Sequence, residues 1–299
     1  MSRRRVALAA ASLLGLAAVG FWAASAPGRL APQTLPAHDP DLANGRVLFF
    51  AGSCIACHRG ADPGADRELP SGGAPFKTPV GTFYPQNLTP DPETGLGRWS
   101  ALDFLNAMRR GVSPRGRHYF PAFPYSSFRF TRTEDLLDLR AYLMSLQPVR
   151  SPERRATVPL LPLARRSVGV WKRLALRETP PAPEPTRSAA WQRGAYLVRA
   201  PGHCGECHTP RNLLMIPIVS RAFEGGAHPA GEGKVPSLRG LLARHRYKDA
   251  ADLALALEFG ETYGYDKISS GGMGRIQANL ARLPQSDLQA IAEYLVSLR

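Results

Sequence analysis

The longest apolar stretch of the chain lies at its N-terminus. An uncharged run of 21 residues extends from Val6 to Ala26, and three arginines at positions 3–5 precede it. The run is long enough to cross a bilayer as a helix, and the arginines favour an orientation with that end in the cytoplasm. Pro27 directly follows the cleavage-like Ala24-Ser25-Ala26 and favours an uncleaved anchor over a cleaved signal. We therefore predict that residues 1–26 are a membrane anchor or signal and that the remaining chain is exported.

After the anchor, apolar residues recur at helical spacing, and the arrangement occurs twice. No run of alternating apolar and polar residues predicts a strand. Each half has an opening helix, a middle helix that ends at a glycine, and a closing helix. The predicted starts are Asp39-Pro40 and Ser188 for the opening helices, Ser100 and Asp249 for the middle helices, and the capping boxes Thr131-x-x-Glu134 and Ser286-x-x-Gln289 for the closing helices. The pattern predicts an all-α fold with two tandem domains and long loops, at residues 41–147 and 188–299.

Residues 148–187 connect the two predicted domains. The segment from Pro148 to Pro185 contains eight prolines and an excess of arginine and lysine, which predicts a mostly extended connector. Within it, residues 163–176 mix Leu, Val and Trp with Arg and Lys. Such a segment either lies on the membrane surface beside the anchor or packs over the seam between two domains. The second alternative is the more common.

All four cysteines belong to two copies of Cys-x-x-Cys-His, at 54–58 and 204–208, which start 150 residues apart. Two thiols one helical turn apart reach the two vinyl groups of one porphyrin, and the adjacent imidazole then faces the iron. The pattern predicts two covalently bound haem c groups, one in each domain. A four-cysteine zinc site or a redox dithiol leaves the histidine after each pair unexplained. The predicted attachment residues are Cys54, Cys57, Cys204 and Cys207, and the predicted proximal iron ligands are His58 and His208.

The sixth iron ligand must come from elsewhere in each half. Met273 lies 65 residues after His208 in a glycine-rich segment that we expect to form a loop, and a thioether is a soft, neutral iron ligand. At the same distance from His58 the first half has Phe123, which cannot bind iron. His118 is the candidate for the first haem. The alternatives are that His118 bonds a haem propionate, or that the first iron is open and five-coordinate.

Other residues near the motifs are expected to have structural roles. Met108 aligns with Leu257 when the middle helices are matched at their final glycines, so we expect it in the core. A proximal histidine also needs an acceptor for its second ring nitrogen. The loops after the motifs offer the carbonyl groups of Pro85 and Pro236 for this purpose.

The chain is strongly basic, with a formal net charge of +14. A basic exterior favours an acidic redox protein or a dehydrogenase subunit as partner, and rapid encounter with it. Nucleic acid is not expected as a partner, because an exported haem protein has little occasion to meet it. Haem attachment of this type occurs in the periplasm. We therefore expect the chain on the periplasmic side of the bacterial cytoplasmic membrane, or free in the periplasm if the N-terminus is cleaved.

Several stretches together resemble one known group of proteins. They are Asn87 to Ser100 (NLTPDPETGLGRWS), Ala107 to Gly111 (AMRRG), Tyr119 to Tyr125 (YFPAFPY) and Cys204 to Asn212 (CGECHTPRN). The chain resembles the bacterial dihaem c-type cytochromes related to the cytochrome subunits of membrane-bound alcohol dehydrogenases. This resemblance implies two cytochrome c folds, periplasmic electron transfer and a partner dehydrogenase or oxidase. The chain departs from this group in two ways. Such dehydrogenase subunits typically carry three haems, whereas this chain has two motifs, and some relatives have Met where this chain has Phe123.

The leading hypothesis is an anchored electron-transfer protein that carries electrons between a dehydrogenase, or another donor, and the respiratory chain. One rival is a dihaem peroxidase-like enzyme in which the first haem keeps an open site for peroxide. Another is a subunit whose main role is to dock and anchor a catalytic protein. The absence of methionine at position 123 is the feature that favours the peroxidase-like alternative.

Overall fold

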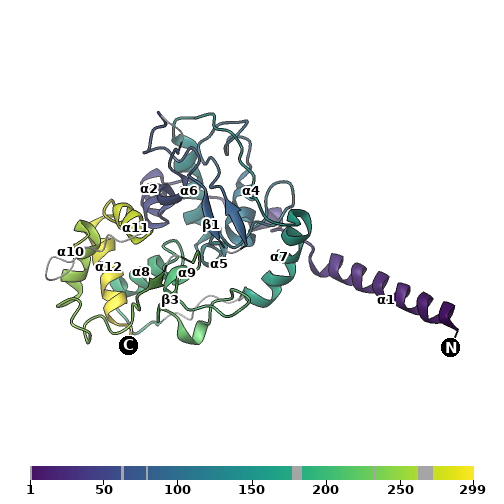
Figure 1. Cartoon of the computed structure of the whole chain (residues 1–299). Helices are drawn as coiled ribbons and strands as arrows, with labels where there is room; N and C mark the ends of the chain where they lie inside the picture. The colour runs from purple at the N-terminus through teal and green to yellow at the C-terminus, as the bar shows by residue number, and fades with distance from the viewer. Residues whose placement is uncertain (1, 62–63, 79, 177–183, 232, 262–271) are drawn as a thin grey trace.

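The structure is a computed structural model that describes residues 2–299 except 62–63, 79, 177–183, 232 and 262–271 (Figure 1). The helices up to residue 175 are α1 (Arg3–Ala24), η1 (Pro32–Thr34), α2 (Leu42–Ala51), α3 (Cys54–His58), α4 (Ala101–Leu105), η2 (Asn106–Arg110), α5 (Tyr125–Phe128), α6 (Thr133–Ser145) and α7 (Leu161–Ala175). The later helices are α8 (Ala189–Arg199), α9 (Gly205–His208), η3 (Val219–Arg221), α10 (Ala250–Phe259), α11 (Gly272–Leu280) and α12 (Gln285–Val296). The predominance of helix follows the sequence pattern.

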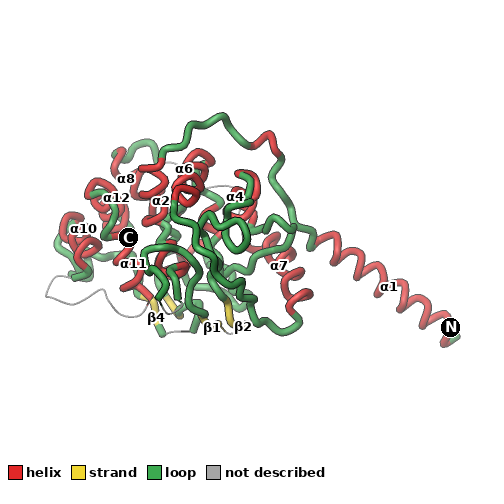
Figure 2. Tube along the Cα trace, turned by 90° about the horizontal axis from the view of Figure 1, so that it is seen from above, coloured by secondary structure: helices red, strands yellow, loops and turns green. Residues whose placement is uncertain are grey.

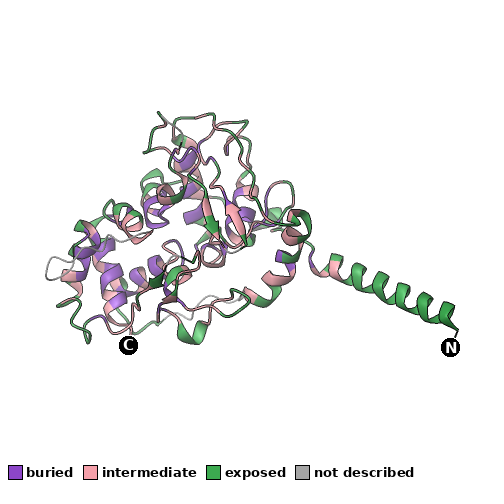
Figure 3. Cartoon of the chain, viewed as in Figure 1, coloured by how far each residue is buried: buried purple, intermediate pink, exposed green. Residues whose placement is uncertain are grey.

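The N-terminal helix α1 projects from the rest of the molecule (Figures 1 and 2). It has 22 residues, and none of them is buried, although the helix is strongly apolar. Figure 3 shows its exposure along most of its length. By length and composition, α1 is able to cross a membrane or to serve as a signal.

In the first half, α2 packs closely against α6. The side chain of Asp41 caps α2 by accepting hydrogen bonds from the backbone N–H groups of Ala43 and Asn44 at 2.8 and 3.1 Å, so the helix starts two residues after the predicted Asp39-Pro40. A Cβ atom on Gly45 would lie 2.2 Å from the carbonyl oxygen of Asp138 in α6. The absence of a side chain at Gly45 therefore permits this close crossing.

The second half repeats this crossing with α8 and α12. Ser188 caps α8 as predicted, accepting a hydrogen bond from the N–H of Trp191 at 3.0 Å. A Cβ atom on Gly194 would lie 1.8 Å from the carbonyl oxygen of Ala290. Beside this contact, the rings of Trp191 and Tyr294 meet edge to face with centroids 5.2 Å apart. Both halves thus use a glycine where an early helix crosses the closing helix.

The middle helices begin and end near the predicted residues. Ser100 forms the predicted capping box with Asp103, and Asp249 accepts a hydrogen bond from the N–H of Asp252. Gly111 and Gly260 end these helices with positive φ angles of 57° and 78°, a conformation that glycine adopts readily. The first middle helix changes to a π-helical turn at η2.

Both predicted caps of the closing helices are wrong. The α6 and α12 helices begin at Thr133 and Gln285, after Arg132 and Pro284, and neither has a side-chain cap. Ser286 lies inside the first turn of α12, where its hydroxyl is not at the cap position. The serine and threonine patterns were therefore displaced from the actual helix starts.

Two further predictions need correction. The connector is not mostly extended, because the 15-residue helix α7 lies within it. Strands also occur, as two short antiparallel hairpins that are too brief to show alternation in the sequence. They pair β1 (Phe76–Thr78) with β2 (Gly81–Phe83) and β3 (Gly226–Ala227) with β4 (Lys234–Val235).

The two halves share one buried core. Buried residues from α2 and α6 and from α8, α10 and α12 belong to a single hydrophobic cluster. The late helix α11 contacts α2 and α3 of the first half. Arg282 pairs with Glu68 and places its guanidinium 5.0 Å from the centre of the Phe50 ring. These contacts hold the N-terminal and C-terminal halves together, with the two Cys-x-x-Cys-His motifs between them.

Candidate haem-binding site

Each Cys-x-x-Cys-His motif follows a residue in the left-handed conformation. Ser53 has a φ of 48° directly before Cys54, and His203 has a φ of 42° directly before Cys204. The chain then turns into the short helices α3 and α9. Because residues three apart share one face of a helix, this geometry suits two thiols that must reach one ligand.

Both motif histidines are held by a backbone carbonyl group. The Nδ1 atom of His58 lies 2.6 Å from the carbonyl oxygen of Gln86, and Nδ1 of His208 lies 2.8 Å from that of Pro236. The prediction for Pro236 is confirmed. The prediction for Pro85 is wrong by one residue, because the Pro85 carbonyl instead accepts a hydrogen bond from the N–H of Gly73 at 3.0 Å.

These two hydrogen bonds define what each histidine offers. A ring nitrogen that donates to a carbonyl group fixes the tautomer and leaves Nε2 as the free ligand atom. Burial lowers the pKa of both His58 and His208, and the carbonyl hydrogen bonds oppose this only in part. Both imidazoles are therefore held neutral, which is the form that binds iron.

The cysteines fit covalent attachment better than a metal site. All four thiols are free, and burial raises the pKa of Cys54 and of Cys204 to about 12. Within the described part of the chain, no three His, Cys, Asp or Glu residues are grouped to hold a metal ion. Each motif thus presents two thiols and one oriented imidazole, the set that haem c needs.

The segments that lead into the two motifs lie against each other. His203 Nε2 is 3.1 Å from the carbonyl oxygen of Gly52, and its ring meets that of Phe128 edge to face at 5.4 Å. A Cβ atom on Gly52 would lie 3.5 Å from the carbonyl oxygen of Pro201. The structure therefore brings the two motifs together across 150 residues of sequence.

Glu206, between the two cysteines of the second motif, ties that motif to the first half. It accepts hydrogen bonds from the hydroxyls of Ser126 and Ser127 in α5, at 2.7 and 2.6 Å, and pairs with Arg211 at 2.6 Å. Burial raises the pKa of Glu206, but Arg211 and the two serines outweigh this and hold the pKa below its usual value. Sequence reasoning missed this role. The sequence offered one signal for it, because Glu206 and Arg211 both lie in residues 204–212, one of the stretches that resemble the dihaem cytochromes.

Met273 lies in a different local structure from the one expected. The predicted loop is helical from Gly272 onward, so Met273 occupies the first turn of α11 and is partly buried. This helix contacts α10 of its own half and α3 of the first motif. Its role as an iron ligand stays a prediction.

His118 has other partners than the first haem motif. Its Nε2 atom lies 2.9 Å from the carbonyl oxygen of Ser25, and its Nδ1 atom lies 3.2 Å from Nζ of Lys172 in α7. Both ring nitrogens are thus engaged at the end of α1, and this placement does not support His118 as an iron ligand.

Met108 and Phe123 of the first half pack against other side chains. Met108 is buried in the hydrophobic cluster, as predicted. Phe123 packs with the rings of Tyr119, Tyr125 and Phe128, with centroids 5.7 to 6.1 Å apart.

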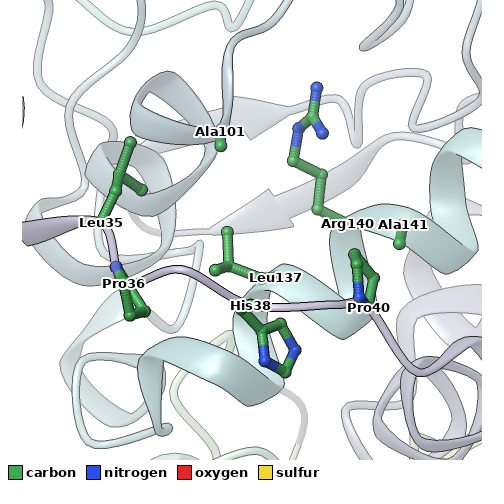
Figure 4. Close-up of a pocket in the computed structure, with 8 residues that line it drawn as sticks. All are labelled: Leu35, Pro36, His38, Pro40, Ala101, Leu137, Arg140 and Ala141. Atoms are coloured by element: carbon green, nitrogen blue, oxygen red, sulfur yellow. The ribbon is translucent and has the colours of Figure 1, made fainter.

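None of the motif residues lines the pocket shown in Figure 4. Its lining residues are Leu35, Pro36, His38, Pro40, Ala101, Leu137, Arg140 and Ala141. His38 is already bonded to Asp138, with Nε2 2.6 Å from a carboxylate oxygen. The pocket therefore offers no chemistry that competes with the haem motifs.

Comparison with known proteins identifies the family of the chain. The profile of the cytochrome c family matches residues 42–147. The chain is 37% identical over 303 residues to a diheme cytochrome c-type protein of Cereibacter sphaeroides, covering 98% of this chain and 97% of the relative. The chain belongs to the bacterial dihaem c-type cytochromes, which are electron-transfer proteins with covalently bound haem c.

Other relatives are subunits of dehydrogenases. The chain is 40% identical over 297 residues to a nicotinate dehydrogenase subunit of Pseudomonas putida, covering 96% of this chain but only 24% of that protein. It is 34% identical over 271 residues to the fructose dehydrogenase cytochrome subunit of Gluconobacter japonicus, covering 89% of this chain and 54% of the relative. The chain thus spans about a quarter of the first protein and about half of the second.

Proposed function

We propose that this protein is a dihaem cytochrome c that transfers electrons between a dehydrogenase, or another donor, and the respiratory chain at the periplasmic face of the membrane. The observation that carries the proposal is the pair of adjacent motifs, each with a histidine fixed by a backbone carbonyl group. Electron transfer favours two redox centres held close together in a rigid frame. The contacts through His203 and Glu206 supply that frame.

The chain is proposed to form two tandem cytochrome c domains at 41–147 and 188–299, joined by residues 148–187 and preceded by an anchor at 1–26. The repeated crossing of α2 with α6 and of α8 with α12 supports this division. One haem is assigned to each domain. Haem supplies reversible one-electron chemistry when bound, while the protein sets its position, ligands and surroundings.

In each domain the same types of residue would hold the haem. Cys54 and Cys57 would attach the first haem, and Cys204 and Cys207 the second. His58 and His208 would present Nε2 to the iron. Met273 is proposed as the sixth ligand of the second haem, because it lies 65 residues after His208 and is only partly buried at the start of α11.

One observation favours a second candidate function. Phe123 stands where the spacing from the second half would place a ligand, and both ring nitrogens of His118 are engaged elsewhere. A first haem without a protein sixth ligand would leave room for peroxide, as in a dihaem peroxidase-like enzyme. Electron transfer stays the leading proposal, because the relatives are named as cytochromes or as cytochrome subunits of dehydrogenases.

A dehydrogenase is the proposed partner, and the membrane is the proposed location. The net charge of +14 favours an acidic docking surface on the partner. The exposed apolar helix α1 would hold the protein at the periplasmic side of the membrane. If α1 is removed as a signal, the same chain would act as a soluble periplasmic carrier.

A redox titration followed by optical spectra tests these proposals. We expect two reduction steps for the wild-type protein, and a change in only the second haem for Met273→Ala. His118→Ala should leave both haem spectra unchanged and serves as the matched control. Rapid reaction of a high-spin ferric haem with peroxide would favour the enzyme instead, whereas two low-spin haems that are inert to peroxide would exclude it.

A further inference from the structure

The connector helix α7 presents a stripe of exposed apolar side chains. Leu163 and Leu174 are 56% and 66% exposed, and Ser167 and Val170 lie between them on the same helical face. Leu160, directly before the helix, extends the stripe and is 76% exposed. Large apolar side chains exposed together in this way indicate an interaction surface.

The opposite side of α7 is firmly packed, so its orientation is fixed. Val168 and Gly169 are buried. The ammonium group of Lys172 donates hydrogen bonds to the carbonyl oxygens of Arg110 and Gly111 at 2.5 and 2.7 Å. The stripe therefore faces outward because the rest of the helix is anchored to the first half.

A second group of exposed apolar residues adjoins α7. Leu213 is fully exposed, and Leu214 and Met215 are 59% and 40% exposed. The indole N–H of Trp171 donates a hydrogen bond to the carbonyl oxygen of Leu214 at 2.8 Å, which holds this loop of the second half against α7. We define the apolar face as the stripe on α7 together with residues 213–215.

The apolar face lies beside the end of the helix that is proposed to cross the membrane. Arg166 donates a hydrogen bond to the carbonyl oxygen of Trp22 at 2.6 Å, and its guanidinium lies 4.1 Å from the centre of that indole ring. Arg173 donates to the carbonyl oxygen of Ala24 at 2.6 Å. Figures 1 and 2 both show α7 next to the C-terminal end of α1.

The charges on α7 have one sign. Residues 161–175 contain four basic side chains and no aspartate or glutamate, whereas Arg211 and Arg221, on either side of residues 213–215, are paired with Glu206 and Glu224. An apolar helix face flanked by cations is the pattern of a helix that lies in the interface of an anionic bilayer. Arginine in such a place buries its stem and keeps its charge near the headgroups.

We propose that the apolar face is a membrane-interfacial surface, which inserts its leucines into the outer leaflet of the cytoplasmic membrane and pairs its cations with anionic phospholipid. The inference rests on the proposal that α1 spans this membrane, because α1 then brings α7 to the bilayer surface. The surface would hold the two haem motifs in a defined orientation above the membrane. The helix α7 also packs over the seam between the two halves, because Trp171 of α7 is hydrogen-bonded to a loop of the second half.

Lipid photocrosslinking tests the proposal with the full-length holoprotein. The protein is reconstituted in phosphatidylcholine–phosphatidylglycerol vesicles that contain a photoactivatable phospholipid, and adducts are mapped by mass spectrometry. We expect adducts on peptides that contain α7 and residues 213–215, as well as on α1. Leu255 and Phe259 of α10 serve as a reference, since they are 51% and 68% exposed and the helix α10 lies far from α1 in Figures 1 and 2.

Matched variants make the outcome specific. Replacing both Leu163 and Leu174 by serine should abolish adducts on the α7 peptide and keep those on α1, whereas serine at 255 and 259 should change neither. Adducts on α1 alone, or equal labelling of α10, would contradict the proposal that the apolar face is a membrane surface. Burial of the apolar face by a partner protein would contradict it too. Absence of adducts from α1 would contradict the proposal that α1 is a membrane anchor. Adducts on α7 without adducts on α1 would support membrane contact by the apolar face even though the anchor proposal had failed.

Discussion

The carboxylate of Glu206 accepts a hydrogen bond from the hydroxyl of Ser127 at 2.6 Å, although the two residues lie in different halves of the chain. Glu206 is inside the second Cys-x-x-Cys-His motif, and Ser127 is in α5 of the first half. The second Cys-x-x-Cys-His segment is therefore part of the interface with the first half. Changes at this interface should affect both stability and communication between the haems.

Glu206→Gln should destabilise the protein. The amide removes the charge that pairs with Arg211 and weakens the hydrogen bonds from the serines. Hydrogen bonds to a buried charge are strong, so we expect a loss of about 2 kcal/mol in the free energy of unfolding, measured by denaturant titration of the holoprotein. Glu224→Gln is the control, because Glu224 forms its ion pairs with Arg221 and Arg239 at a more exposed place. Equal effects of the two changes would contradict the proposed role of Glu206.

His203→Asn should slow electron transfer between the two haems. Asparagine tolerates the positive φ of His203, but its shorter side chain removes the contact with Gly52 and the ring contact with Phe128. The measurement is the rate of electron redistribution after flash reduction of one haem. His245→Asn is the matched control, because His245 also has a positive φ and is exposed. An unchanged rate in His203→Asn would show that this contact does not position the motifs.

The pair of His38 and Asp138 should make stability depend on pH. The hydrogen bond to Asp138 raises the pKa of His38 above its ordinary value of 6.5. Burial raises the pKa of Asp138, but hydrogen bonds from Asn44, His38 and the N–H of Asp41 outweigh this and hold the pKa below 3.8. The contribution of His38 is fully present below pH 6.5 and is lost as the pH rises through the raised pKa, while that of Asp138 is lost as the pH falls through its lowered pKa.

His38→Ala therefore tests the sign of this linkage. The difference in unfolding free energy between wild type and variant should be larger at about pH 5 than at about pH 9. Denaturant unfolding of the holoprotein at both pH values gives the measurement. A larger difference at the higher pH would show that the His38–Asp138 pair does not stabilise the folded state in the way the structure indicates.

Gly194→Ala should disrupt the crossing of α8 with α12. The new Cβ atom would meet the backbone at Ala290, which cannot move away as a flexible side chain could. We expect a loss of about 3 kcal/mol in unfolding free energy and a changed spectrum of the second haem. Gly28→Ala is the control, because nothing lies within 4 Å of its Cβ position. Wild-type stability of Gly194→Ala would contradict the close helix crossing.

The parts of the fold that could be predicted depend on neighbours in the sequence. The caps at Ser100, Ser188 and Asp249 are local hydrogen bonds, and the proximal acceptor at Pro236 lies in the loop that follows its motif. The acceptor of His58 was missed by one residue, since adjacent carbonyl groups in an irregular loop are alike in sequence. Local sequence rules therefore cannot tell whether the carbonyl group of Pro85 or that of Gln86 accepts the hydrogen bond from His58.

Long-range contacts could not be predicted in the same way. The engagement of His118 by Ser25 and Lys172 depends on where α1 and α7 meet, which no spacing in the sequence reveals. The role of Glu206 likewise depends on the position of α5. The haem attachment residues stay a prediction, which the sequence alone permits because their spacing follows from the porphyrin itself, whereas the surroundings of each motif are set by the tertiary fold.

Intact-mass analysis of the haem content tests the central claim most directly. The wild-type holoprotein should carry two covalently bound haems. Replacing Cys54 and Cys57 together by alanine should leave one, and the same change at Cys204 and Cys207 should leave the other. A wild-type chain with fewer than two covalent haems, or a double variant that keeps both, would contradict the account of one haem at each motif.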